Sequence, residues 1–283
     1  MEVISVQSHV SFGHVGNSAA VYPMQRLGVD VWPVHTALLA HHPGHGGFNG
    51  AMTSPQTVRA IFGGLHRLGA FEQCSALLSG YLGSVETGTV LIEAWQTIKA
   101  AAPDAIFCCA AVLGDREEGI YVDPALPAFF RDAALPMADV IVANAFEAGI
   151  LSGMEVVDLE TARLAAAAIA DQGPQTVIIS SVPYALNGTT HVGNLLNEAG
   201  GVWLTYAPLF SGPAKGAGDF MTAVWLAQYL NERDSVSALR FATGAVKSAV
   251  ELSAEHPIRE LAVIAASDQW HDGSSDVGLQ KIG

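Results

Sequence analysis

The stretch SGPAKGAGDF (residues 211–220) places three glycines around one lysine and ends in an aspartate followed by a phenylalanine. Glycine tolerates positive φ and lets a backbone approach a ligand closely. The next residues, FMTAVWLAQYL (220–230), have the apolar content of a buried helix. A glycine-rich turn that opens a helix presents unpaired N–H groups at the positive end of the helix dipole, where anions bind. Taken alone, the segment fits either an anion cradle with Asp219 as a base or an ordinary turn.

Upstream of this stretch, short apolar runs alternate with longer segments of helical periodicity. Strands are expected at 2–6, 29–36, 75–80, 104–110, 138–143, 175–182 and 205–210, and helices at 54–69, 86–102, 123–135, 159–173 and about 218–266. Nearly continuous apolar strands separated by helices indicate a mostly parallel sheet with helices on both faces. Because no internal repeat or linker is visible, residues 1–283 are expected to form one domain.

Polar and glycine-rich loops follow the predicted strands. They comprise residues 7–17, 37–50 (a loop or short hairpin), 80–84, 110–115, 144–147 and 211–219. In an open parallel sheet, ligands bind at the carboxyl ends of the strands, so these loops should share one crevice. Their convergence favours the anion cradle over the turn.

The composition limits the possible partners. Half of the 283 residues are hydrophobic, and the net charge is −14 with only 13 lysines and arginines. Such a chain lacks the basic stripe that nucleic-acid binding requires, and a bound phosphate must rely on backbone N–H groups, helix ends or a metal. No signal peptide and no apolar run of about 20 residues is visible. The cysteines, Cys74, Cys108 and Cys109, fit reduced intracellular thiols, so a cytoplasmic protein without membrane contact is expected.

Two of the loops carry polar side chains with two interpretations each. Asn144 and Glu147 lie one helical turn apart, which fits either a helix cap or a pair that handles magnesium-bound water and phosphate. His41, His42 and His45 fit a polar lid, one member of which contacts a substrate, or a metal site.

Tyr81 ends a predicted strand between two glycines. It is either a surface aromatic or a platform for a flat substrate ring.

The motifs at the strand ends, taken in order, resemble those of the pyridoxal kinases of the ribokinase superfamily, and most closely their bacterial branch. These motifs are QSHVSFGHVGNSAA (7–20), VWPVHT (31–36), LLSGYLGS (77–84), N-x-x-E (144–147) and GAGD (216–219). The first and third are specific to the branch, whereas the last marks the superfamily. The resemblance extends from about residue 3 to residue 270.

The resemblance implies a three-layer α/β sandwich with a doubly wound sheet. It also implies transfer of the ATP γ-phosphate to the 5′-hydroxymethyl group of a pyridoxal-type ring, with ATP and Mg²⁺ as cofactors and a homodimeric assembly. The implied roles are Asp219 as the base, Gly216, Ala217 and Gly218 as the anion hole, Ser8, His42 and Tyr81 as substrate contacts, Asn144, Glu147, Ser180 and Ser181 on the nucleotide side, and Glu147 and Asp115 at the metal. Phosphoryl transfer needs such positioning and charge neutralisation more than covalent chemistry.

Some positions depart from the family pattern. Ala110 and Ala111 replace an aspartate and a proline, Ser180 and Ser181 stand where relatives carry a lysine, and Pro43 and His45 replace a hydroxyl residue and a tyrosine. The leading hypothesis is a vitamin B6 kinase, with a hydroxymethyl-pyrimidine or another small alcohol as the alternative substrate. A degenerate homologue with weak turnover is the rival, which Ala110 and Ser180 favour and the retained Asp219 opposes.

Overall fold

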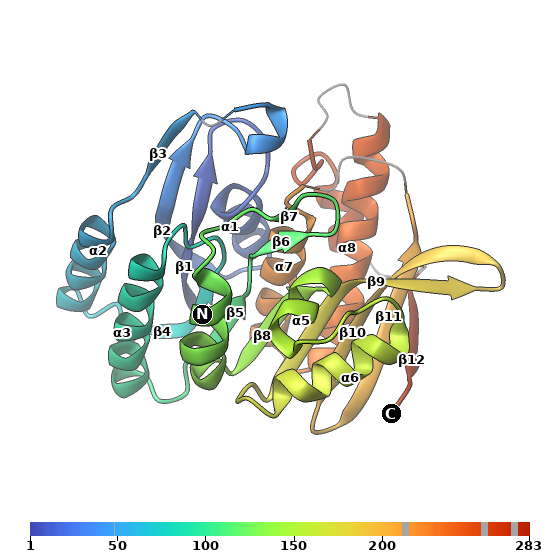
Figure 1. The fold of residues 1–283 in the computed structure, drawn as a ribbon. Helices are drawn as coiled ribbons and strands as arrows, with labels where there is room; N and C mark the ends of the chain where they lie inside the picture. Colours follow the sequence, from blue (N-terminus) through green and yellow to red (C-terminus); the bar gives the residue numbers. More distant parts are fainter. Residues whose placement is uncertain (48, 211–214, 256–259, 273–276) are drawn as a thin grey trace.

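A mixed sheet organises the computed structural model, which describes residues 1–47, 49–210, 215–255, 260–272 and 277–283 (Figure 1). Within those residues the sheet has ten strands, in the spatial order β12 (Gly278–Lys281), β11 (Gly201–Pro208), β10 (Thr189–Glu198), β9 (Thr176–Leu186), β8 (Val140–Asn144), β5 (Ile106–Ala110), β4 (Cys74–Ser79), β1 (Glu2–Val10), β2 (Asp30–Leu39) and β3 (Gly50–Met52). The six strands from β9 to β2 are parallel to their neighbours, whereas β10 to β12 and β3 pair antiparallel. Residues 211–214 of the glycine-rich stretch lie outside the described ranges.

Helices cover both faces of the sheet (Figure 1). One face carries α2 (Pro55–Arg67), α3 (Val85–Ala101), α4 (Leu126–Phe129), α5 (Ala145–Ser152) and α6 (Leu159–Ala170), and the other carries α1 (Asn17–Arg26), α7 (Ala217–Glu232), α8 (Ser235–Glu255) and α9 (Ser267–Asp272). Each face has its own apolar core, because successive residues of a strand point to opposite sides. The three-layer sandwich expected from the sequence is confirmed.

The alternation of side chains also keeps two adjacent cysteines apart. Cys109 belongs to the core under α3, whereas Cys108 belongs to the core under α7. Together with Cys74 they are buried free thiols, as the sequence predicted. Among the helices of the described ranges, none is both long enough and apolar enough to cross a membrane.

Several elements differ from the sequence-based expectation. The strand expected at 2–6 continues to Val10, and the loop expected up to residue 17 gives way there to α1, whose Pro23 weakened its helical signal. The helix expected at 123–135 is split into α4, a π turn and a 3₁₀ turn. The hairpin expected within 37–50 is present, because β2 turns back into β3 after a 3₁₀ turn at Pro43–His45.

The antiparallel strands β10 and β12 were missed. The two-residue connection between β9 and β10 consists of Asn187 and Gly188, both with positive φ, at 52° and 78°. Asn-Gly with this backbone forms the turn that matches the twist of a hairpin. No strand was expected between residues 182 and 205, so the returning strand β10 departs from the sequence-based expectation.

The order of the strands in the sheet determines where the ligand-binding crevice lies. β1 lies between β2 and β4 and is parallel to both, so the chain winds away from β1 in two directions. At such a switch point the loops after the strands diverge and leave a ligand site at the carboxyl edge. The N-terminus of α7 meets the β1–α1 loop at this edge.

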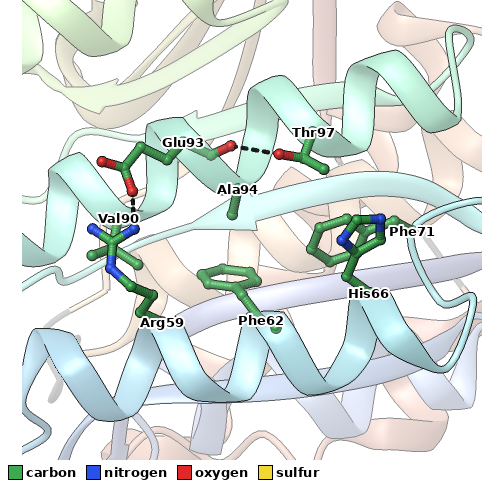
Figure 2. A pocket seen from close by; sticks show the side chains of 9 residues that line it. Arg59, Phe62, His66, Phe71, Val90, Glu93, Ala94 and Thr97 are labelled. Carbon is green, nitrogen blue, oxygen red and sulfur yellow. Dashed lines mark hydrogen bonds and ion pairs between the residues drawn. The ribbon is translucent and has the colours of Figure 1, made fainter.

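A separate groove of about 180 Å³ lies between α2 and α3 (Figure 2). Its lining residues are Arg59, Phe62, Gly63, His66, Phe71, Val90, Glu93, Ala94 and Thr97. An ion pair between Arg59 and Glu93 spans it, and the rings of His66 and Phe71 stack with centroids 5.0 Å apart. Because Phe71 shortly precedes β4, that end of the groove is at the amino edge of the sheet, opposite the crevice.

Candidate active site

The N-terminus of α7 forms the floor of the candidate site. Gly216 is the N-cap with φ of 85°, and a Cβ atom there would lie 1.7 Å from the carbonyl oxygen of His14. Only glycine therefore fits at this position. Phe220 donates to the Gly216 carbonyl, so the N–H groups of the residues before it have no acceptor within the helix. A Cβ on Gly218 would meet no atom within 4 Å, which leaves the first turn open to a ligand.

Asp219 lies in this first turn, and the β1–α1 loop across the crevice holds its side chain in place. Its Oδ2 accepts a 2.7 Å hydrogen bond from the backbone N–H of Gly16, and its Oδ1 has no partner in the described part of the chain. Burial raises the pKa of Asp219, and the Gly16 N–H opposes that rise. Solvent still reaches part of the residue. The carboxylate is thus oriented through one oxygen, while the other can accept a proton.

Ser8 is close to this carboxylate because Gly16 joins them. A Cβ on Gly16 would lie 2.3 Å from the Ser8 carbonyl oxygen and 2.6 Å from its Oγ. Ser8 is buried near the end of β1. The structure therefore brings the predicted substrate contact Ser8 next to the predicted base.

Tyr81 follows the neighbouring strand β4. Gly80 donates to the carbonyl of Val6 at 3.0 Å, and Thr36 donates its hydroxyl to the Tyr81 carbonyl at 2.5 Å. These bonds fix the backbone of Tyr81 beside β1 and β2. Burial raises the pKa of its hydroxyl, which therefore stays neutral and can serve as a hydrogen-bond donor.

The lid, residues 41–47, is tied to a buried carboxylate. His42 Nε2 lies 2.9 Å from Glu260 Oε1, and His45 Nε2 contacts the same oxygen. Glu260 Oε2 accepts the backbone N–H of His14 at 3.2 Å. Burial alone would raise the pKa of Glu260, but the hydrogen bonds from His45 and His42 bring it below its usual value.

The hydrogen bonds favour the lid over the metal site. Ligand atoms of His42, His45 and Glu260 lie within 4.8 Å of one another, which would suit a metal ion. However, the N–H of Gly44 donates to His42 Nδ1 at 3.2 Å. In this arrangement Nδ1 is the acceptor nitrogen of His42, and Nε2 carries the proton that it donates to Glu260. A metal ion at this nitrogen would have to displace that proton and break the hydrogen bond to Glu260.

Asn144 and Glu147 form a capping box at the start of α5. Asn144 Oδ1 accepts from the Glu147 N–H at 3.0 Å, and Glu147 Oε2 accepts from the Asn144 N–H at 2.8 Å. Glu147 Oε1 accepts from the N–H groups of Leu113 and Gly114, at 2.9 and 3.4 Å. The cap is therefore real, and it also holds the turn that follows β5.

The same carboxylate fits a magnesium ion. Glu147 is buried with no basic side chain paired to it in the described ranges. Burial raises its pKa to about 7 despite three N–H donors, and the charge of Asp219 adds to the rise. A nearby divalent cation would compensate this charge, directly or through water. The donor set therefore agrees with the metal role that the sequence assigned to Glu147.

Asp115 is engaged elsewhere. Its Oδ1 accepts from the N–H groups of Glu117 and Glu118, at 3.0 and 2.8 Å, and its Oδ2 pairs with Lys215 Nζ at 2.8 Å. Burial alone would raise the pKa of Asp115, but the hydrogen bond and charge of Lys215, together with the N–H groups of Glu118 and Glu117, bring it below its usual value. Metal binding by Asp115 would require Lys215 to move.

Ser180 and Ser181 form a β-bulge on β9. Asn144 pairs with Ser180, which brings the bulge beside the capping box. Ile179 and Val182 pair with Leu195 and Gly193, so the two serines oppose one residue of β10. Ser181 has φ of 58°, a conformation that costs a non-glycine residue about 1–3 kcal/mol and is concentrated at functional sites.

Three further residues belong to the crevice but were not selected from the sequence. Tyr121 is 45% exposed, but loss of water around its hydroxyl raises its pKa, and the charges of four carboxylates, those of Glu147, Asp219, Asp115 and Glu118, raise it further. The pKa of this one phenol is affected by all four acids, which indicates that the acids lie in the same part of the crevice. Glu260 and Lys215 are the other two. Lys215 had a visible signal, as the lone cation of the glycine-rich stretch, whereas Glu260 is far from the lid in sequence.

A hollow of about 420 Å³ lies beside the lid, between the end of β1 and the β2–β3 hairpin. It is lined by His9, Ser11, Leu38, Leu39, Ala40, Asn49 and Gly50. The predicted substrate contacts Ser8, His42 and Tyr81 do not line it.

The doubly wound sandwich, with an aspartate and uncapped N–H groups at its carboxyl edge, defines a ribokinase-like fold. Residues 13–261 match the family described as phosphomethylpyrimidine kinase. Pyridoxal kinase PdxY of Corynebacterium diphtheriae is 36% identical over 268 residues, which cover 95% of each chain. Pyridoxal kinase PdxY of Rubrobacter xylanophilus is 37% identical over 269 residues, which cover 95% of this chain and 93% of the relative.

Solved structures agree with this match. The pyridoxal kinase from Leishmania donovani in complex with ADP and pyridoxamine superimposes with a TM-score of 0.91 at 29% identity, covering 100% of this chain and 99% of that one. The chain therefore belongs to the phosphomethylpyrimidine kinase family and, within it, to the group of the bacterial pyridoxal kinases.

Proposed function

We propose that this protein is a kinase that transfers the γ-phosphoryl group of ATP to the 5′-hydroxymethyl group of pyridoxal or a related B6 vitamer, giving pyridoxal 5′-phosphate. The observation that carries the proposal is the position of Asp219, fixed by Gly16 at the uncapped N-terminus of α7. The names of the relatives, and the ADP and pyridoxamine bound to the Leishmania donovani enzyme, support the choice of substrates.

Asp219 acts as the general base. With Oδ2 held by Gly16, Oδ1 can receive the proton of the substrate hydroxyl. Burial raises the pKa of Asp219, which makes its carboxylate a stronger base than that of a solvated aspartate.

The N–H groups of Ala217 and Gly218 form the anion hole with the N-cap Gly216. They point from the positive end of the α7 dipole, where the charge on the transferring phosphoryl oxygens develops. Because these donors belong to a helix backbone, no reorganisation is needed during the reaction.

Magnesium, when bound, neutralises the phosphate charge of the nucleotide. Glu147 would hold it, together with Asp115 once the ion pair of Asp115 with Lys215 opens. Asn144, Ser180 and Ser181, which the β8–β9 pairing brings together, would contact the nucleotide.

Ser8, Tyr81 and His42 would receive the ring of the alcohol substrate. The lid, fastened through Glu260, would exclude water from the reacting phosphate. A hydroxymethyl-pyrimidine is the second candidate substrate, because the matching family is described as phosphomethylpyrimidine kinase and so includes enzymes that act on a related pyrimidine.

Three further proposals concern the whole protein. Residues 1–283 would form one domain, two copies would associate as a homodimer, and the protein would reside in the cytoplasm. Light scattering at micromolar concentration tests the assembly, and a monomer mass would contradict the homodimer.

The test of the function is a coupled assay of ATP consumption with pyridoxal, pyridoxine, pyridoxamine and hydroxymethyl-pyrimidine. We expect turnover with at least one B6 vitamer and its loss in Asp219→Asn. Turnover with hydroxymethyl-pyrimidine alone would replace the substrate assignment. No turnover with any of the four, while ADP still binds, would favour the degenerate homologue.

A further inference from the structure

A lysine is held between two acids at the mouth of the crevice. Lys215 Nζ lies 2.8 Å from Asp115 Oδ2 and 2.8 Å from Glu118 Oε1. Both acids belong to the small hairpin of β6 (Gly114–Asp115) and β7 (Gly119–Ile120). The Lys215 side chain remains 41% exposed, and its ammonium lies 5.9 Å from the centroid of the Tyr121 ring.

The chain fixes Lys215 beside the anion hole. Lys215 directly precedes Gly216, the N-cap of α7, so its side chain starts within one residue of the uncapped N–H groups. On its other side, Gly114 of the hairpin donates to Glu147 Oε1. Lys215 is therefore next in the chain to the helix end that would bind the transferring phosphoryl group, and it is connected through Asp115 and Gly114 to the carboxylate that fits magnesium.

The crevice contains more acidic than basic side chains, so a cation is needed to bind a further negative charge there. Four carboxylates, those of Asp115, Glu118, Glu147 and Asp219, act on the hydroxyl of Tyr121. In the described ranges, no lysine or arginine other than Lys215 forms an ion pair with any of them. A nucleotide polyphosphate brings further negative charge to this space, and the whole chain already carries −14.

The ion pairs that hold Lys215 are of a kind that exchanges readily. Pairs of exposed side chains contribute little stability, because water and salt screen them. A phosphate offers more negative charge and more acceptor oxygens than one carboxylate, and a lysine stem is flexible enough to turn toward it.

We propose that Lys215 is a phosphate-binding residue, which leaves Asp115 and Glu118 to contact the polyphosphate of the bound nucleotide. This inference rests on the proposed kinase function, because it assigns the nucleotide phosphates to the N-terminus of α7. Release of Lys215 also frees the carboxylate of Asp115 for the metal. The alternative is that Lys215 only fastens the β6–β7 hairpin to the start of α7.

Two substitutions separate these roles. Lys215→Met removes the charge and keeps the stem, whereas Glu118→Gln weakens the hold on Lys215 and leaves Asp115 in place. A phosphate-binding Lys215 should lose ADP affinity about 10- to 100-fold in Lys215→Met, because a charge-assisted hydrogen bond is lost. Glu118→Gln should bind ADP as tightly as the wild type or more tightly. A lysine that only fastens the hairpin would instead make both variants bind ADP more weakly.

Calorimetric titration with ADP measures these affinities without turnover, so the result does not depend on phosphoryl transfer. Lys215→Arg should restore most of the affinity, and Lys281→Met, which removes the same charge at the distant β12 edge, should not change it. The affinity for pyridoxal should stay the same in all four variants. Unchanged ADP affinity in Lys215→Met, or a parallel loss in Glu118→Gln, would overturn the proposal. A wild type that binds ADP but transfers no phosphate would refute the kinase function alone.

Discussion

On the lid side of the crevice, the buried carboxylate of Glu260 meets two histidines, whereas on the nucleotide side Glu147 meets only backbone N–H groups. The pKa of Glu260 is therefore lowered and that of Glu147 is raised to about 7. On the lid side, all the partners of the carboxylate belong to the protein itself. On the nucleotide side, the carboxylate has a negative charge that a bound cation would compensate. The lid half of the crevice is therefore organised before any ligand binds, whereas the nucleotide half needs its ligands.

Asp219 joins the two halves. It is tied to the β1–α1 loop through Gly16, and the same loop reaches Glu260 through the N–H of His14. Its charge also raises the pKa of Glu147. A substitution of Asp219 should therefore have the largest effect of any in the crevice.

Asp219→Asn should reduce turnover by about 10²–10⁴-fold and leave the affinities for ADP and pyridoxal nearly unchanged, because the amide keeps the shape but cannot accept the proton. Steady-state kinetics together with calorimetric binding measure both parts. An unchanged kcat would remove Asp219 from the role of base.

The nucleotide side should also determine how stability depends on pH. The pKa of Glu147 is raised above its unfolded value, so the folded protein keeps a proton that the unfolded chain releases. The stabilisation is complete below the unfolded pKa and is lost as the pH rises toward about 7. In metal-free buffer, the free energy of unfolding of the wild type should fall relative to that of Glu147→Gln by about 3 kcal/mol between pH 4.5 and pH 7. Parallel pH profiles of the two proteins in urea titrations would show that Glu147 does not titrate in this range.

Gly218→Val tests the anion hole between the two halves. The open space around Gly218 lets the variant fold, but the branched side chain should cover the N–H groups of the first turn. We expect the affinity for a non-hydrolysable ATP analogue to fall by about 10- to 100-fold, the effect of losing hydrogen bonds to a charged group. Gly218→Ala is the matched control and should keep most of the affinity. Normal binding of the analogue by the valine variant would return the segment to an ordinary turn.

On the lid side, Glu260→Gln should raise the KM for pyridoxal about tenfold, because the amide has no negative charge and its NH2 group cannot accept from the N–H of His14. The KM for ATP should stay the same, since the lid belongs to the alcohol side. Glu251→Gln, at an exposed position of α8, is the control for removal of a carboxylate. Equal changes in both KM values would show that Glu260 supports the fold rather than the lid.

The two halves also differ in how much the sequence could predict. The capping box of Asn144 and Glu147 and the glycine-rich start of α7 are local patterns, so spacing alone located them. The hydrogen bond between His42 and Glu260 spans 218 positions in the sequence, and no local pattern encodes a contact of that range. The bulge at Ser181 depends likewise on the register of β9 against β10.

The parallel sheet was predictable because buried strands and amphipathic helices alternate regularly. The antiparallel edge was not, since β10 and β12 are less uniformly apolar and lie outside that alternation. Tertiary context decided the pairing of these edge strands, as it commonly does for sheets.

The smallest expected effect concerns Ala110, at the carboxyl end of β5 near the capping box. The resemblance places a carboxylate at this position, where it would share the metal with Glu147. Ala110→Asp should lower the magnesium concentration for half-maximal activity about two- to fivefold, because an added negative charge favours a divalent ion. The new acid would also repel the nucleotide phosphates, but an ion bound between the charges would screen that repulsion.

Ala110→Asn has nearly the same shape as Ala110→Asp without the charge and should leave the magnesium requirement unchanged. Measured at saturating ATP, equal magnesium dependence in the wild type and Ala110→Asp would show that this position does not face the metal, and a raised KM for ATP alone would show that repulsion dominates.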